Sequence, residues 1–321
     1  MPISRDISYA AQLIREGKVV AFPTETVYGL GANALNALAV ARIFELKERP
    51  SFDPLIVHIA DLDELRRLTT ANDPRIDILA ENFWPGPLTL ILPKSSAIPD
   101  IVTSGLETVG IRMPANPIAR ELIRRAECPV AAPSANKFGQ LSPTLARHVA
   151  KQLPDADCIL DGGPSEVGIE STIISLNEQG FEILRHGSIT REEIEKYIPY
   201  HALPDKERTN IVSPGMLKSH YSPQKPLYIQ GDAANIPTNR SESGLLSFRG
   251  EDISGYREVE VLSPTGDLKA CAVNLFAAIH RLEESDVRFI VAESVPETGI
   301  GIAVMDKLRK AAYRYSEKGI E

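Results

Sequence analysis

Two short polar turns carry the residues best suited to hold phosphate. Lys47-Glu48-Arg49-Pro50 puts two cations on one turn, and Pro133-Ser134-Ala135-Asn136 puts a hydroxyl and an amide on another. Arginine offers a planar fork of donors and lysine a compact positive charge, so both recognise phosphate oxygens. Neither turn has the composition of a segment that buries itself in a core. Together they predict a pocket for a phosphate-bearing ligand.

The same residues also have plainer interpretations. Lys47 and Arg49 complement the dipole at a helix C-terminus, which is a sufficient structural reason for two cations there. His58 lies within an apolar strand, where a histidine is more often part of the core. Arg112 is equally compatible with a ligand contact and with the solvent face of an edge strand. Ser142 is a good helix N-cap, and we expect it to cap a helix that begins at Pro143.

Hydrophobic spacing predicts short strands and helices in the first 200 residues. Helices are expected over residues 7–16, 37–48, 62–69, 75–83 and 118–126. Gly17 is expected to end the first helix as its C′ residue. Asn36 is the expected N-cap of the second helix, and Pro50 ends it. The cations of the first turn therefore fall at the helix end and in the following loop, where they can converge. Two strands, residues 172–176 and 181–185, predict a hairpin.

The chain changes character near residue 200. Periodicity disappears in favour of prolines and charges, which predicts a linker over residues 200–225. Beyond it, strands alternate with helices, which implies a small, mainly parallel sheet covered on both faces. The sequence thus predicts an α/β (α+β) protein. Residues 1–199 form a domain with a concave, mixed, twisted sheet, and residues 226–321 a small Rossmann-like parallel α/β domain.

Composition excludes several classes of protein. The net charge of −8 over 321 residues argues against a general nucleic-acid binder, which needs a basic face. Cys128, Cys158 and Cys271 are far apart, so neither a structural zinc site nor a disulfide framework is expected. There is no apolar run of membrane-spanning length and no secretory leader pattern. We expect a cytoplasmic protein without membrane contact.

Further motifs extend the pattern along the chain. They are residues 23–30, Ser142-Pro143-Thr144, Glu170-Ser171-Thr172-Ile173, Ser213-Pro214-Gly215-Met216 with His220-Tyr221, and residues 303–312. With the two turns, and in this order, they resemble the YrdC-like threonylcarbamoyl-adenylate synthases in their long, two-domain form. The resemblance implies a nucleotidyltransferase that joins L-threonine, bicarbonate (or CO2) and ATP. Its products would be threonylcarbamoyl-adenylate and pyrophosphate.

The resemblance also implies partners and cofactors. A downstream tRNA threonylcarbamoyl transferase system would pass the group to the adenosine beside the anticodon, as the t6A modification. Mg2+ would accompany ATP. We expect no tightly bound organic cofactor, no metal held by the protein itself and no tight direct binding of nucleic acid.

Individual roles follow from the same resemblance. Lys47 and Arg49 would stabilise charge during catalysis, and Tyr221 would fold over the filled site as part of the linker. The residues implied in ATP binding are Lys47, Arg49, Asp53, Thr108, Ser134, Asn136, Ser142, Arg185 and Tyr221. Those implied in L-threonine binding are Thr26, His58, Arg112, Ala132 and Ser171.

Three positions depart from the family pattern. Asp53 and Asp306 stand where asparagine is usual, and His186 stands where proline is usual. An anion at position 53 is unfavourable beside phosphates unless it meets a cation. We also expect the second domain to anchor the linker, so that deletion after Pro223 lowers activity and leaves the first domain folded.

Two other functions stay open. A carbamoyltransferase of the hydrogenase-maturation type would share only the first domain, and this chain has no cysteine pairs for the zinc fingers such proteins usually add. An RNA-binding module could use a concave first domain. The acidity of the chain and the lack of an aromatic-rich basic strand count against it.

Overall fold

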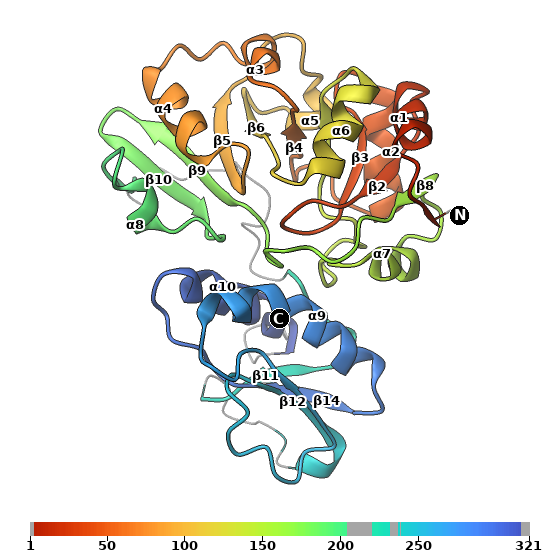
Figure 1. The fold of residues 1–321 in the computed structure, drawn as a ribbon, viewed down its shortest axis with the longest axis vertical. Coiled ribbons are helices and arrows are strands. Elements are labelled where there is room, and N and C mark those ends of the chain that lie inside the picture. The colour runs from red at the N-terminus through yellow and green to blue at the C-terminus, as the bar shows by residue number, and fades with distance from the viewer. Residues whose placement is uncertain (1–2, 204–219, 232–236, 238, 316–321) are drawn as a thin grey trace.

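The computed structural model describes residues 3–203, 220–231, 237 and 239–315, and Figure 1 shows them as two parts. The linker motif Ser213-Pro214-Gly215-Met216 lies outside the described residues. Within them, no helix combines the length and the apolarity needed to cross a membrane.

The first part is built on one ten-stranded mixed sheet, as predicted. Its strands, in spatial order, are β1 (Ile3–Ser4), β8 (Cys158–Leu160), β2 (Val20–Phe22), β3 (Gly29–Asn33), β7 (Val130–Ala131), β4 (Ile56–His58), β6 (Thr108–Arg112), β5 (Leu88–Pro93), β9 (Thr172–Asn177) and β10 (Gly180–Arg185). β9 and β10 form the predicted antiparallel hairpin. β4 and β6 are parallel, and their register sets His58 opposite Arg112. This pairing brings two of the predicted threonine contacts onto neighbouring strands.

Helices cover the sheet on both faces because alternate strand residues point to opposite sides. They are α1 (Ile7–Arg15), α2 (Ala37–Lys47), α3 (Leu62–Leu68), α4 (Pro74–Phe83), α5 (Asp100–Thr103), α6 (Pro117–Ala126), α7 (Ala146–Gln152) and α8 (Arg191–Ile194). Val20 and Phe22 of β2 belong to the apolar cluster under α1 and α6, whereas Val19 and Ala21 belong to the cluster that includes α2.

The helix ends follow the predicted chemistry in two cases and not in a third. Asn36 accepts hydrogen bonds from the backbone N–H groups of residues 38 and 39, and α2 ends at Glu48, whose φ is +55°. Gly17, with φ +77°, follows the end of α1. The helix expected at Pro143 is wrong, since α7 begins only at Ala146. The Ser142 hydroxyl does not cap it because it donates to a carboxylate, described below.

The second part has a four-stranded, all-parallel sheet in the order β11 (Leu227–Ile229), β14 (Phe289–Ala292), β12 (Ser243–Ser247), β13 (Glu258–Val261). Its helices are α9 (Leu268–Glu284) and α10 (Ile300–Ala312), with short 3₁₀ turns η2 (Arg240–Glu242) and η3 (Tyr313–Tyr315). Both helices pack in the cluster that contains Leu246 and Ile290. The opposite face, with Leu245 and Phe289, carries no α-helix among the described residues, so the expectation of helices on both faces is not met there.

Helices α9 and α10 lie between the small sheet and the first part (Figure 1). One apolar cluster joins Val27, Leu141 and Ile169 of the first part to side chains of α9 and α10. His148 of α7 stacks on His280 of α9, with ring centroids 3.9 Å apart. The two parts therefore share a packed interface. The predicted boundaries, residues 1–199 and 226–321 with a linker between, stay predictions, and β11 begins one residue after the second starts.

Candidate active site

The two polar turns meet through Lys47. Its ammonium donates to the backbone carbonyls of Ser134, at 2.6 Å, and of Asn136. Lys47 and Asn136 are each only 1% exposed, so the expectation that these turns stay outside the core is wrong. A buried ammonium is tolerated when carbonyl oxygens replace its water. Burial lowers the pKa of Lys47 well below its ordinary value, and the neighbouring charge of Arg49 lowers it further.

Arg49 is held from behind by the loop that follows it. Its Nε donates to the carbonyl of Asp53 at 3.0 Å and its Nη2 to the carbonyl of Pro54 at 2.9 Å. The carboxylate of Asp53 forms an ion pair with the same Nη2 at 2.9 Å, and both side chains are buried. Burial raises the pKa of Asp53, while Arg49 opposes that change. The unusual anion at position 53 thus meets a cation.

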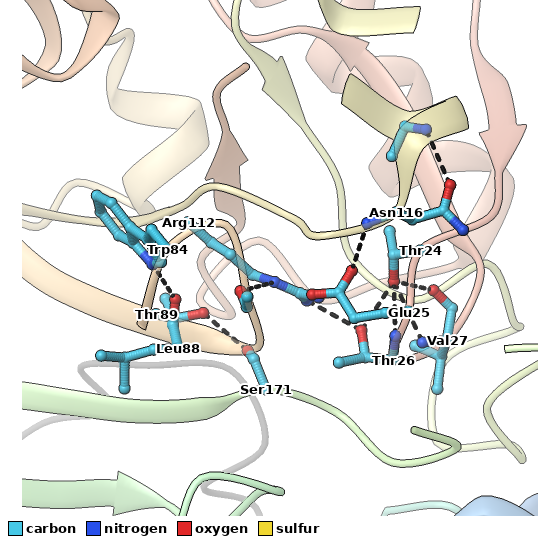
Figure 2. A network of polar contacts seen from close by, with 12 residues as sticks. Thr24, Glu25, Thr26, Val27, Trp84, Leu88, Thr89, Arg112, Asn116 and Ser171 are labelled. Carbon is cyan, nitrogen blue, oxygen red and sulfur yellow. Dashed lines mark hydrogen bonds and ion pairs between the residues drawn. The ribbon is translucent and has the colours of Figure 1, made fainter. Parts of the chain in front are cut away.

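Arg112 lies in a second polar network, which Figure 2 shows from close by. Its guanidinium donates to the Thr26 hydroxyl at 2.9 Å, to the Gly86 carbonyl at 3.3 Å and to Glu25, with which it forms a buried ion pair at 2.6 Å. The solvent-face interpretation of Arg112 is wrong, because the residue is 3% exposed. Sequence reasoning missed Glu25. The signal was a single charge within residues 23–30.

His58 is both buried and on the cavity wall, so the core and ligand interpretations are compatible. Burial lowers its pKa to about 3, and the charge of Arg112 acts in the same direction. The imidazole is therefore neutral at physiological pH. Its Nδ1 has no hydrogen-bond partner in the part of the chain that the structure describes.

Ser171 connects the two halves of the site. Its hydroxyl lies 2.7 Å from that of Thr89 (Figure 2). Arg185, at the end of β10, donates to the Ser171 carbonyl at 3.0 Å and to its hydroxyl at 2.9 Å. A residue expected to contact nucleotide is thus hydrogen bonded to one expected to contact threonine.

One cavity collects most of the predicted residues. Those on its wall are Thr26, Arg49, His58, Arg112, Ala132, Ser134, Ser171, Arg185 and Tyr221. Lys47, Asp53 and Asn136 lie behind this wall through the contacts above. Thr108 is not brought to the cavity, since it lies at the end of β6 away from Arg112, roughly 13 Å of strand away.

Glu170 lines the cavity and is a second residue that sequence reasoning did not assign. Its Oε1 accepts a hydrogen bond from the Ser142 hydroxyl at 2.5 Å, which explains why Ser142 caps no helix. Its Oε2 is buried and has no hydrogen-bond partner among the described residues. This carboxylate faces a wall that otherwise carries Arg49, Arg112 and Arg185.

Tyr221 closes the cavity from the linker side. Its side chain is fully buried, and its backbone has the left-handed φ of +62°, which is costly for a residue other than glycine. Its neighbours fasten it to both parts: His220 N–H donates to the Lys310 carbonyl at 3.3 Å, and Ser222 N–H donates to the Gly139 carbonyl at 2.8 Å. Burial raises the pKa of the Tyr221 hydroxyl well above its ordinary value.

No group of three or more histidine, cysteine or carboxylate side chains able to hold a metal ion occurs among the described residues. What the site offers instead is a wall of arginines and hydroxyls, with the imidazoles of His58 and His220 and the carboxylate of Glu170. Such a wall suits anionic ligands that bring their own counter-ion.

The arrangement of a mixed sheet, a guanidinium-lined cavity and a small parallel domain defines a class of two-domain enzymes for phosphate-bearing ligands. The chain belongs to the Sua5/YciO/YrdC family. The family model described as "Telomere recombination" matches residues 12–187. A second model, described as "Threonylcarbamoyl-AMP synthase, C-terminal domain", matches residues 189–313 and identifies the long form of the family. The resemblance inferred from the motifs is confirmed.

Relatives match along nearly the whole chain. The threonylcarbamoyl-AMP synthase of Pyrococcus abyssi is 44% identical over 95% of this chain and 94% of its own length. That of Bacillus subtilis is 46% identical over 95% and 92%. The crystal structure of P. abyssi Sua5 complexed with L-threonine superposes with a TM-score of 0.84 at 42% identity, covering 95% of this chain and 94% of that one. A putative threonylcarbamoyl-AMP synthase of Methanocaldococcus jannaschii matches 59% of this chain with 89% of its own length.

Proposed function

We propose that this protein is an L-threonylcarbamoyladenylate synthase, an ATP-using nucleotidyltransferase of t6A biosynthesis. The observation that carries the proposal is similarity to threonylcarbamoyl-AMP synthases across both parts of the chain. The cavity adds physical support, because it combines a phosphate-binding wall with a separate guanidinium suited to a carboxylate.

We assign the L-threonine end to Arg112 and the residues around it. The guanidinium would bind the threonine carboxylate, and Thr26, His58, Ala132 and Ser171 would surround the rest of the amino acid. Glu25 lies behind Arg112 and does not line the cavity. This arrangement supports a role for Glu25 in neutralising the buried guanidinium until a ligand carboxylate arrives. It also fits the relative that was crystallised with L-threonine.

We assign the ATP end to Arg49, Ser134 and Arg185, with Lys47 and Asn136 supporting them from behind. The remaining residues in the ATP set are Asp53, Ser142, Tyr221 and Thr108. Thr108 is the weakest member, since it lies away from the cavity. Mg2+ would arrive with the triphosphate and neutralise part of its charge.

The reaction needs little covalent help from the protein. The threonine amine attacks the carbon of CO2 and loses a proton, or attacks that of bicarbonate with loss of water, and a carbamate forms. A carbamate oxygen then attacks the α-phosphorus of ATP, and the bond from that phosphorus to the departing pyrophosphate breaks. Such steps depend on positioning and on stabilisation of charge, which Lys47 and Arg49 would supply. Tyr221 would keep water from the carbamate.

The product would pass to a downstream tRNA threonylcarbamoyl transferase system. A cytoplasmic location, where that system and ATP would meet this protein, stays a prediction. So does the absence of tight nucleic-acid binding, which titration with tRNA at two salt concentrations would test, since electrostatic binding weakens steeply as salt rises.

The deciding experiment measures pyrophosphate release from ATP with bicarbonate and each amino acid in turn. We expect release only with threonine and bicarbonate, and its loss in Lys47→Ala and Arg49→Ala. Lys137→Ala is the matched control, because that lysine is near the same turns but pairs with the exposed Glu48. A requirement for carbamoyl phosphate would instead identify a carbamoyltransferase. ATP binding without release under any condition would overturn the proposal.

A further inference from the structure

Helix α10 of the second domain sends one buried cation toward the active site. The side chain of Lys307 is fully buried, and its ammonium donates to the backbone carbonyl of His186. It also forms an ion pair with Asp306 at 3.2 Å. Burying an ammonium is costly unless partners replace its hydration, so a lysine in this position requires these contacts.

The first of these contacts leads to the nucleotide side of the cavity. His186 directly follows Arg185, which lines the cavity and donates two hydrogen bonds to Ser171. The His186 carbonyl belongs to the peptide that joins residues 186 and 187, so holding it restrains the backbone one residue beyond Arg185. The contact spans the domain interface, because β10 belongs to the first domain and α10 to the second.

A further contact leads to the lid that Tyr221 forms over the cavity. The Lys307 ammonium lies 5.8 Å from the centroid of the Tyr221 ring, within the range of a cation–π interaction. The same ring lies 5.3 Å from that of Phe276 on α9. Tyr221, whose backbone φ is strained, thus has side-chain partners in the second domain.

We propose that Lys307 is a positioning residue, which holds Tyr221 closed over the cavity and keeps Arg185 oriented toward the nucleotide. The proposal rests on the proposed synthase activity for its chemical consequence only. It gives the second domain a definite role, because one side chain of α10 joins the lid and the nucleotide wall. Lys310 offers a matched comparison, since it lies three residues further along the same helix and pairs with the same Asp306 at 2.9 Å.

Loss of the contact between Lys307 and Tyr221 should let water enter the cavity. Water reaching the product would attack the carbamoyl carbon of threonylcarbamoyl-adenylate and break its bond to the AMP oxygen. AMP and the carbamate of threonine would form, and the carbamate would then release CO2 and threonine. Pyrophosphate would still be released, so the yield of threonylcarbamoyl-adenylate per pyrophosphate would fall.

The test compares Lys307→Met, Lys307→Gln and Lys307→Arg with Lys310→Met as the control. The first readout is hydrogen–deuterium exchange at the amides of His220 and Ser222, which needs no activity. We expect at least tenfold faster exchange in Lys307→Met, and near wild-type exchange in Lys307→Arg and Lys310→Met. Lys307→Gln keeps a donor for His186 and loses the cation, so it should be intermediate and covers the case in which the methionine variant does not fold.

The second readout is the yield of threonylcarbamoyl-adenylate per pyrophosphate, with the KM for ATP. We expect the yield to fall at least threefold and KM to rise about tenfold in Lys307→Met, with rescue in Lys307→Arg. If Lys307 had only a structural role, its loss would change the amount of active enzyme and leave the yield per pyrophosphate and the KM for ATP unchanged. Unchanged exchange and yield in Lys307→Met and Lys307→Gln would overturn the proposal. An inactive wild type would overturn the synthase assignment, and the exchange data would still decide the role of Lys307.

Discussion

The ion pair between Glu25 and Arg112 allows a sharp test of how the threonine side is built. The change is Glu25→Gln, which preserves shape and removes one charge. The pair is 2.6 Å long with side chains 5% and 4% exposed, so the substitution leaves a buried guanidinium without its counter-charge. Arg112 keeps its hydrogen bonds to Thr26 and Gly86.

Breaking a buried pair by removing one partner costs about 3–5 kcal/mol, and the retained hydrogen bonds place this case at about 3 kcal/mol. For a chain of 321 residues that corresponds to a fall in Tm of roughly 4–5 °C. The control is Glu121→Gln, because Glu121 pairs with Arg125 at the same 2.6 Å with both side chains exposed. That variant should stay within about 1 kcal/mol of wild type.

The assay is thermal unfolding with and without L-threonine. If Arg112 binds the threonine carboxylate, the ligand supplies the missing anion in Glu25→Gln, so threonine should raise Tm more in the variant than in wild type. An equal Tm for variant and wild type would refute the stabilising role of the pair. A smaller threonine shift in the variant would refute the assignment of Arg112 as the carboxylate anchor.

The effect of pH on the stability from this ion pair follows from the direction in which the pKa of Glu25 is shifted. Burial alone would raise the pKa of Glu25, and the charge and hydrogen bond of Arg112 outweigh it, so the folded pKa lies below the ordinary 4.5. The stability that the Glu25–Arg112 pair contributes is therefore fully present above pH 4.5 and is lost as pH falls through the pKa of Glu25 in the folded protein. The stability gap between wild type and Glu25→Gln should narrow below pH 4.5.

Three further predictions concern other parts of the molecule. Asp53→Asn should tighten ATP binding in calorimetry, because it removes a buried carboxylate that pairs with Arg49 and would repel the phosphates. Weaker binding would mean that Asp53 serves the nucleotide directly. Burial and the stacked His280 lower the pKa of His148 to about 3, so the stability that the neutral imidazole contributes is present above pH 6.5 and is lost as pH falls. Between pH 7 and 5, the free energy of unfolding of His148→Phe should therefore fall by about 2 kcal/mol less than that of wild type, as measured by denaturant unfolding. Gly168→Ala should destabilise the protein by at least about 2 kcal/mol more than Gly105→Ala. Both glycines have positive φ, but only at Gly168 would an added Cβ lie 2.5 Å from the backbone of α9. Equal Tm values for the two variants would refute this close approach of Gly168 to α9.

Local chemistry made much of the fold predictable. Asn36 and Gly17 carry cap signals that act within a few residues, and the structure has both. The alternation of strands and helices after residue 226 likewise gave the parallel sheet. The side on which α9 and α10 pack depends on contacts with the first domain, which no short-range pattern encodes.

The candidate site shows the same division. The polar turns were found because Lys47 and Arg49 are conspicuous in type and spacing. The burial of Lys47 was not predicted, since it depends on carbonyls about ninety positions away in the chain. Glu25 and Lys307 were missed for a related reason. Each acts through a partner distant in sequence, and alone each looks like an ordinary surface charge.

The apolar cluster shared by the two domains bears on how such a gene can be divided. Val27, Leu141 and Ile169 are covered by the second domain, so a first domain made alone would present them to water. A deletion after Pro223 would therefore change solubility as well as activity. The two halves of this chain therefore depend on each other for the burial of these three side chains, and a chimera that changes their partners on α9 or α10 should lose stability.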